Sequence, residues 1–386
     1  MKIKFTPLAI GCALFAFAGQ SQTFNSGSDG SNGALSVTTA APSETVIELP
    51  PNGILNYTTI NIASGKTVRF KRNAANTPVY LLASGNVTIA GRIEVNGAVG
   101  SSVTGGLGGP GGFDGGSPGS VGVQPGAGQG PGAGKGGAGN VNADGAGAGS
   151  FSTVGESGDS DNRGAVYGNA LIVPLVGGSG GGGTAGVPGF GGGGGGGAVL
   201  VASSTRIDLS GSIAAVGGNG GGNAFNGGSG GAVRLVAPVI AGRGSIDVRP
   251  NAGAGYGRIR IDAIDRTGMG FDFVEDRVTS VGSLMLVFPN PLPRLNITEA
   301  AGTAIPEGSG PVVMQLPFGS TPNRTIKVQA RDFNAKVPIT VVLTPDHGAP
   351  LTYTSDIDNA TSNPATRTID VVLPVNEQTT VNVYSK

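Results

Sequence analysis

The chain has 386 residues and a formal net charge of zero, with 24 basic and 24 acidic residues. Glycine occupies 74 positions, far above the average of about 7%. The balanced charge excludes the basic surface by which many proteins bind nucleic acid or anionic lipid. A charged fraction of only 12% with 38% apolar residues favours a β-rich exported protein over a charged disordered chain.

The first 18 residues have the pattern of a secretory signal peptide. Two lysines in Met1–Lys4 precede the apolar run Phe5–Ala18, which ends in the small-x-small sequence of a cleavage site. The run is shorter than the roughly 20 residues that span a bilayer, so the mature chain is expected to have no transmembrane segment. Cys12 lies within the signal and is followed by apolar residues, which disfavours lipidation. The pattern therefore predicts a secreted protein, extracellular or on the cell surface, that has no disulfide.

Residues 19–53 form a polar entry segment, rich in glycine and serine at its start. Asp29 could suggest calcium, but an isolated aspartate among such residues is usually a turn residue. From residue 54 the pattern changes: Ile60 and Ile62 alternate with a polar residue, as do Val68 and Phe70. Alternation with period two predicts half-buried strands, and we expect a first block of strands over residues 54–97.

A strand–corner unit of about 20 residues recurs along the chain. It is clearest in Gly197–Gly222, where Gly211 predicts a turn between two strands, and it returns at Val79–Gly97 and Ala232–Pro250. Such a unit cannot bury its own apolar face, so copies must stack on one another. The pattern predicts an all-β fold, a parallel β-solenoid whose second block covers residues 198–288 and ends with a strand at Leu284–Phe288.

Residues 98–197 interrupt the repeat with glycine, alanine, serine and few charges. Glycine loses the most backbone entropy on ordering, which favours a mobile low-complexity insertion. The alternative is that the glycine runs pack against one another as extended, left-handed threefold helices. Asp159 and Asp161 resemble half a calcium loop but lack the bidentate glutamate. Matches to G-x-G-x-x-G occur here by chance, and no helical pattern follows them.

After a proline-rich boundary at Pro289–Pro293, alternating strands resume with turn signals between them. The expected strands are Leu295–Thr298, Val312–Leu316, Thr325–Ala330, Ile339–Leu343, Thr368–Leu373 and Thr380–Tyr384. This pattern over residues 291–386 predicts a small β-sandwich. The single histidine, His347, lies in a turn without an evident nucleophile, so we expect a solvent-exposed residue rather than part of a catalytic triad.

The sequences ILNYTTINIASGKTVRF and VYLLASGNVTIAGRIEVNG, with the glycine-rich insertion between blocks, resemble glycine-rich bacterial secreted proteins of the parallel β-helix kind. These include filamentous-haemagglutinin-like and pectate-lyase-like solenoids, and the resemblance covers roughly residues 54–288. It implies the architecture more than an activity. No catalytic positions of that superfamily can be matched to residues of this chain.

Two functions from different classes remain. The first is an exported, adhesin-like structural protein of the surface or matrix, without catalysis, which contacts polysaccharide and self-associates. The alternative is a polysaccharide lyase or hydrolase on the same scaffold, which needs carboxylates clustered on one face. Its candidates are Asp208, Asp247, Asp262 and Asp265.

Weaker hypotheses attach to other residues. Arg69, Lys71 and Arg72 could bind an anionic sugar, although outward charges on strands usually serve solubility. An ice-binding surface would need regular Thr-x-Thr rows, and only Thr58-Thr59 suggests one. We therefore predict no catalytic, cofactor-binding or metal-binding residue, and no nucleic-acid partner.

Overall fold

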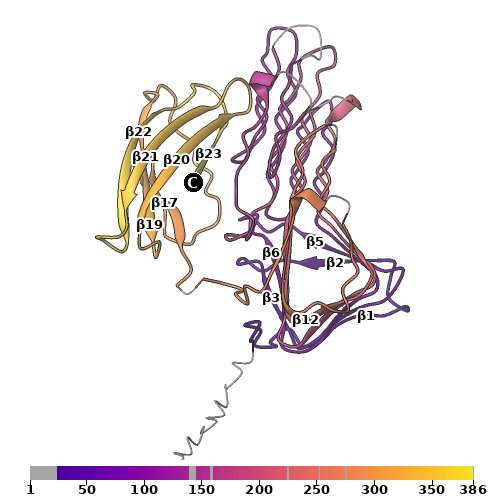
Figure 1. Ribbon diagram of the computed structural model, residues 1–386. Coiled ribbons are helices and arrows are strands. Elements are labelled where there is room, and N and C mark those ends of the chain that lie inside the picture. The colour runs from indigo at the N-terminus through magenta and orange to yellow at the C-terminus, as the bar shows by residue number, and fades with distance from the viewer. Residues whose placement is uncertain are drawn as a thin grey trace, which may run out of the picture.

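The computed structural model describes residues 24–138, 145–156, 160–223, 226–251, 253–273, 276–289 and 291–385. The predicted signal peptide, with Cys12, and Asp159, which with Asp161 resembles half a calcium loop in the sequence, lie outside these residues. The described chain is all-β apart from three short 3-10 turns, η1 (Ser160–Asn162), η2 (Gly221–Asn223) and η3 (Asp276–Val278). Figure 1 shows a triangular stack of strands, a bundle of extended segments above it, and a separate group of sheets beside the bundle.

The triangular part contains strands β1 to β16. They are β1 (Leu35–Val37), β2 (Glu44–Glu48), β3 (Ile54–Tyr57), β4 (Ile60–Ile62), β5 (Thr67–Lys71), β6 (Val79–Ala83), β7 (Val87–Ile89), β8 (Arg92–Glu94), β9 (Ala198–Ser203), β10 (Arg206–Leu209), β11 (Ser212–Ala214), β12 (Ala232–Ala241), β13 (Ser245–Asp247), β14 (Arg258–Asp265), β15 (Asp272–Phe273) and β16 (Thr279–Gly282). Every pairing among them is parallel.

Each strand pairs with the corresponding strand of the next turn of the chain. One face consists of β3, β6, β9, β12, β14 and β16; a second of β1, β4, β7, β10 and the end of β12; a third of β2, β5, β8, β11, β13 and β15. We call this part the stacked turns. The stacking begins at β1 and β2, so the predicted entry segment of residues 19–53 already contains the first turn. The predicted strand at Leu284–Phe288 is wrong, because β16 ends at Gly282.

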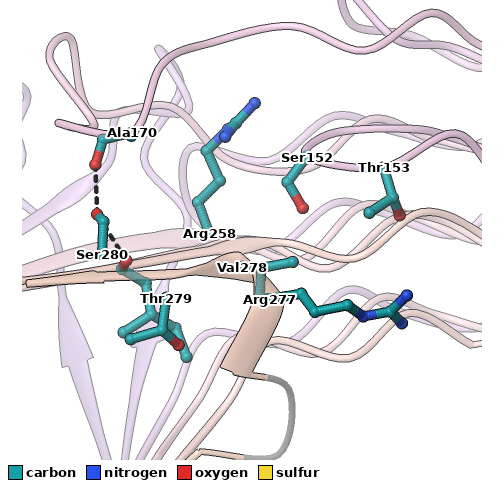
Figure 2. A pocket seen from close by; sticks show the side chains of 9 residues that line it. Ser152, Thr153, Ala170, Arg258, Arg277, Val278, Thr279 and Ser280 are labelled. Atoms are coloured by element: carbon teal, nitrogen blue, oxygen red, sulfur yellow. Dashed lines mark hydrogen bonds between the residues drawn. The ribbon is translucent and has the colours of Figure 1, made fainter.

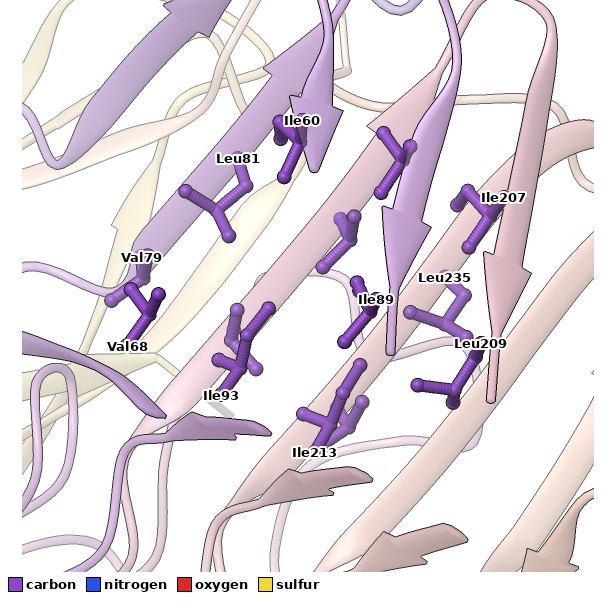
Figure 3. Close-up of a cluster of buried hydrophobic side chains, with 14 of the residues drawn as sticks. Ile60, Val68, Val79, Leu81, Ile89, Ile93, Ile207, Leu209, Ile213 and Leu235 are labelled. Atoms are coloured by element: carbon purple, nitrogen blue, oxygen red, sulfur yellow. The ribbon is translucent and has the colours of Figure 1, made fainter. Parts of the chain in front are cut away.

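The registers place like residues on top of one another. Ile60 pairs with Val87, Val87 with Ile207, and Ile207 with Ile240. These side chains point inward and are buried, together with the isoleucines and valines of the other two faces (Figure 3). Fully burying one such side chain contributes roughly 1.5–3 kcal/mol, so the column supplies a continuous core along the stack.

The glycine-rich residues are packed in an ordered bundle rather than looped out. The central segment Gly191–Gly197 donates backbone hydrogen bonds to three neighbours in strict rotation. Every third residue donates to the same neighbouring segment. The first neighbour accepts at Ser101, Ala98 and Val95 (from Gly191, Gly194 and Gly197), the second at Gly116 and Phe113 (from Gly192 and Gly195), and the third at Asn226 and Ser229 (from Gly193 and Gly196). A bonding period of three residues is that of extended threefold helices. We call these packed segments, between residues 95 and 257, the glycine bundle.

The central segment also accepts hydrogen bonds from further neighbours. Gly106 donates to Gly192, Gly181 to Gly193, and Gly218 to Gly194. A segment bonded on all sides leaves no room for side chains: a Cβ on Gly195 would overlap the carbonyl oxygen of Gly178. The described residues therefore contradict the mobile interpretation and follow the alternative of packed threefold segments. Asn226 and Ser229 belong to the turn between β11 and β12, so the bundle extends beyond residues 98–197.

The chain ends in two antiparallel sheets. One contains β17 (Arg294–Ala300), β18 (Thr303–Ala304), β19 (Asn323–Arg331) and β22 (Ala365–Val372), and the other contains β20 (Lys336–Pro345), β21 (Leu351–Asp358) and β23 (Thr379–Ser385). Both sheets contribute to a single core that includes Val328 and Val341. We call this part the C-terminal sheets. The predicted strand at Val312–Leu316 is absent, and Val313 in that segment is fully exposed.

The C-terminal sheets contact the side of the glycine bundle (Figure 1). The rings of Phe113 and Tyr384 meet edge to face with centroids 5.9 Å apart. Gly348 donates a backbone hydrogen bond to the carbonyl oxygen of Pro125 at 3.3 Å. The glycine bundle thus lies between the stacked turns and the C-terminal sheets.

The packing predicts that a single methyl group inside the bundle destabilises the protein. Gly195→Ala should lower the free energy of unfolding by at least about 2 kcal/mol, because the new Cβ meets backbone that cannot move aside. Gly310→Ala is the control, since nothing lies within 4 Å of a Cβ at that position. Chemical unfolding followed by circular dichroism measures both. Equal stability of the two variants would contradict the packed bundle.

Candidate functional site

A small cavity of about 130 Å³ lies where the last stacked turns meet the glycine bundle (Figure 2). Its floor is formed by β14 and by the η3–β16 segment, and its upper wall by the bundle. The lining residues are Ser152, Thr153, Ala170, Arg258, Ile259, Arg277, Val278, Thr279 and Ser280. The lining includes two guanidinium groups and four hydroxyl groups but no carboxylate.

Arg258 opens β14 and rises from it into the cavity wall (Figure 2). Its Nη2 donates to the carbonyl oxygen of Tyr167 at 2.7 Å, and its guanidinium carbon lies 5.3 Å from the centre of the Phe151 ring. Burial lowers the pKa of Arg258, and the opposing influence is that of Tyr167. Its Nε is buried without a hydrogen-bond partner, and within the described residues no carboxylate forms an ion pair with it.

The hydroxyl groups of the cavity are held by the backbone. Ser152 Oγ donates to the carbonyl oxygen of Tyr256 at 2.8 Å, and Ser280 Oγ donates to that of Ala170 at 2.7 Å. The second bond joins the last stacked turn to the bundle across the cavity. Hydrogen bonds to the backbone thus fix the positions of these two hydroxyl groups.

The four aspartates of the hydrolase hypothesis do not share one face. Asp208 lies on β10 and accepts two hydrogen bonds from Arg206, at 2.6 and 2.7 Å. Asp247 lies on β13, in the other parallel sheet, and is paired with Arg249. Asp265 accepts a hydrogen bond from Thr267. Asp247 thus lies apart from the others in a second sheet, whereas Asp208 and Asp265 belong to one sheet and both act on the charge of Arg206. Each of the three has its own local donor.

Asp262, the fourth candidate, is fully buried between two arginines. Its carboxylate oxygens lie 3.2 Å from Arg234 Nη2 and 2.6 Å from Arg260 Nη2. Asp262 Oδ1 also accepts the backbone N–H of Leu284, and Arg234 Nη2 donates to the carbonyl oxygen of Leu286 at 2.7 Å. This cluster fastens the segment that leads to the C-terminal sheets onto the outer face of β12 and β14. Its carboxylate is occupied by structure and faces no cavity described above.

The three cations of Arg69, Lys71 and Arg72 are all paired. Arg69 bridges Glu44 and Glu94, Lys71 contacts Glu48 at 2.9 Å, and Arg72 contacts Asp114 at 2.5 Å. The pairing with Asp114 joins a stacked turn to the glycine bundle. The cluster therefore offers no uncompensated positive charge to an anionic sugar.

The remaining candidates have local roles. Asp29 accepts the backbone N–H of Ser31 at 2.9 Å, as a turn residue does. The main-chain oxygen of Asp161 accepts from Lys135 Nζ. His347 is partly exposed, and its Nδ1 lies 2.8 Å from Glu377 Oε1. Among the described residues, no group of three or more histidine, cysteine, aspartate or glutamate side chains could hold a metal ion.

Arg258 and Arg260 alternate with Ile259 and Ile261, a pattern that places both arginines on the outer side of one strand. The structure separates them: Arg260 pairs with Asp262 within β14, whereas Arg258 packs on Phe151. No periodicity in the sequence places Phe151 and Tyr167 beside β14. Only the folded glycine bundle brings them there.

Comparison with family models, with curated proteins and with solved structures found no match for this chain. The described residues contain no helix that is both long enough and apolar enough to cross a membrane.

The buried cluster predicts a large difference between two similar substitutions. Asp262→Asn removes the charge that compensates buried Arg234, and should cost about 3–5 kcal/mol of stability. Asp208→Asn breaks an exposed pair and should cost less than about 1 kcal/mol. Urea unfolding of both variants measures the difference, and a similar small cost for both would show that the cluster does not fasten the segment.

A second prediction concerns the pH dependence of stability at Asp346. Partial burial, followed by the nearby charge of Glu377, raises the pKa of Asp346 in the folded protein. A raised carboxyl pKa favours the folded state at low pH, and this contribution is lost as the pH rises through the folded-state pKa. Asp346→Asn should therefore melt at a slightly higher temperature than the parent at neutral pH. The difference between the two melting temperatures should disappear on acidification.

Asp358 provides the control of opposite sign. Hydrogen bonds from Thr361 lower the pKa of Asp358, so its carboxylate stabilises the fold above its unfolded pKa of about 3.9. Asp358→Asn should therefore melt below the parent at neutral pH. Differential scanning calorimetry of both variants and the parent, at neutral and at acidic pH, measures these melting temperatures. If both variants changed the melting temperature at neutral pH in the same direction, the opposite pKa shifts of Asp346 and Asp358 would be contradicted.

Proposed function

We propose that this chain is an exported, non-catalytic protein of the cell surface or matrix, adhesin-like in its architecture. In this proposal the stacked turns form a parallel β-solenoid, and the C-terminal sheets form a β-sandwich. The proposal of a solenoid is supported by the parallel registers that link each turn to the next on all three faces. The pattern of residues 1–18 supports export.

The observation that carries the proposal is that a rigid framework presents loops with exposed apolar tips. Val103, Val121 and Val187 are 78%, 64% and 81% exposed. Their loops leave neighbouring bundle segments: Gly119 donates to the carbonyl oxygen of Thr184, and Gly191 to that of Ser101. Residues 97–104, 117–125 and 184–190 contain no charged side chain. These loops therefore offer a partner apolar and backbone contacts, and no charge.

The placement of the carboxylates supports a non-catalytic role. A glycosidase needs two carboxyl groups about 5–9.5 Å apart on opposite sides of a bound sugar. Asp208, Asp247 and Asp262 are instead each neutralised by an arginine and lie on different strands of two sheets. The cavity beside Arg258 has no carboxylate in its lining.

The proposed partner is a polysaccharide of the surface or matrix, and self-association is proposed as a second property. Strand β2 of the first turn lies at the edge of its sheet, and Val46 on this strand is 55% exposed. An exposed strand edge can pair with another chain. The two properties are separable, because the loop tips and this edge belong to different parts of the chain.

The proposal predicts binding without turnover. The purified mature chain should bind to polysaccharides on a glycan array. It should release no unsaturated product or reducing end from pectin, alginate or hyaluronan, with or without calcium. A variant with Val103, Val121 and Val187 changed to serine should lose array binding by about tenfold, since the apolar contacts are removed while the fold is untouched.

The matched control changes three other exposed valines, Val313, Val372 and Val375, to serine. It should bind the array like the parent. Calcium-dependent release of unsaturated product by the parent would overturn the non-catalytic role. Equal binding by both triple variants would remove the loop tips from the proposal.

A further inference from the structure

We propose that the cavity beside Arg258 is a binding site for an oxyanion, the carboxylate or sulfate group of an acidic sugar. This proposal deepens the proposed function, because it names acidic sugars as the part of the polysaccharide that is bound. It rests on that function only in taking a polysaccharide as the molecule that carries the oxyanion. The site itself is argued from Arg258 and its surroundings.

The charge of Arg258 is the first step. A guanidinium that is taken out of water normally acquires a carboxylate partner, because an uncompensated buried charge is costly. Two buried arginines of the stacked turns follow this rule: Arg234 and Arg260 share Asp262. Arg258 instead has an aromatic ring and one backbone carbonyl, and the desolvation that lowers its pKa is not offset by any carboxylate.

The unfilled bonding capacity of Arg258 is the second step. A guanidinium has five N–H donors in a planar fork that matches carboxylate and sulfate oxygens. One Nη2 bond to Tyr167 is formed, and the buried Nε has no partner. The side chain is therefore fixed in position while much of its donor capacity is unused.

The lining of the cavity is the third step. Ser152, Thr153 and Ser280 line the space, as does Arg277 at its edge. Ser152 Oγ and Ser280 Oγ already donate to backbone carbonyl oxygens, whereas Thr153 Oγ1 accepts the backbone N–H of Tyr256 and keeps its own O–H for a ligand. Figure 2 shows Arg258 rising on one side and Arg277 extending beneath Thr153 on another. A volume of about 130 Å³ accommodates a small charged group, with the sugar that carries it outside. The guanidinium of Arg258 and the O–H of Thr153 favour an anion, and the lining contains no carboxylate.

The hollow on the C-terminal sheets provides a contrast. It is larger, about 550 Å³, and its lining contains both Arg324 and Asp370. A neighbouring carboxylate opposes the binding of an anion there. The cavity beside Arg258 is therefore the better oxyanion site.

The test is titration of the full mature chain with methyl glucuronide, glucose 6-sulfate and methyl glucoside, followed by backbone amide NMR. The two anionic sugars should shift the amides of Ile259 and Ser280, and the neutral glucoside should not. The carboxylate and sulfate arms distinguish the two sources of the oxyanion. Equal shifts from the neutral sugar, or no shift from either anion at millimolar concentration, would overturn the proposal without any variant.

Variants then assign the binding to Arg258. Arg258→Gln should weaken anion binding at least tenfold, and Arg258→Lys should retain part of it because the charge remains. Arg206→Gln, on another face and paired with Asp208, should bind like the parent. Undiminished affinity in a folded Arg258→Gln protein would also overturn the site. Array binding to neutral glycans alone, with no anion effect, would refute this inference and leave the proposed function standing.

Discussion

The structure depends on the need to satisfy every buried backbone N–H and C=O group. In a bundle made of glycine the backbone is nearly the only bonding group available. The threefold rotation of donors along Gly191–Gly197 gives each successive residue a different neighbour, so one segment is bonded in several directions at once. Glycine loses much conformational entropy on folding, and this dense network is what offsets the loss.

The stacked turns and the glycine bundle solve the same problem in different ways. In the turns, parallel ladders bond the backbone while isoleucine and valine fill the interior. Around the central segment Gly191–Gly197, close packing of backbone takes the place of side chains, and buried side chains such as Phe151 and Ile172 lie elsewhere in the bundle. The two regions are continuous: β9 directly follows Gly197, and the turn between β11 and β12 contributes Asn226 and Ser229 to the bundle. The bundle therefore grows out of the stack.

Charged residues mainly join these parts to one another. Arg72 with Asp114 links a turn to the bundle, and Asp262 with Arg234 holds the segment that leads to the C-terminal sheets. Arg258 differs from Arg72 and Arg234, since its contacts are an aromatic ring and a carbonyl oxygen. Its surroundings therefore support a ligand more than a structural pairing.

The sequence by itself determined the strand elements of the turns, because period-two alternation and corner glycines such as Gly211 are local signals. The tertiary structure decided whether residues 98–197 pack, because a run of glycine carries no periodicity, and its order depends on neighbours distant in the chain. It also decided the candidate site. Arg258 is visible in the sequence only as an outward residue of a strand, and Phe151 and Tyr167 reach it solely because the bundle folds back over β14.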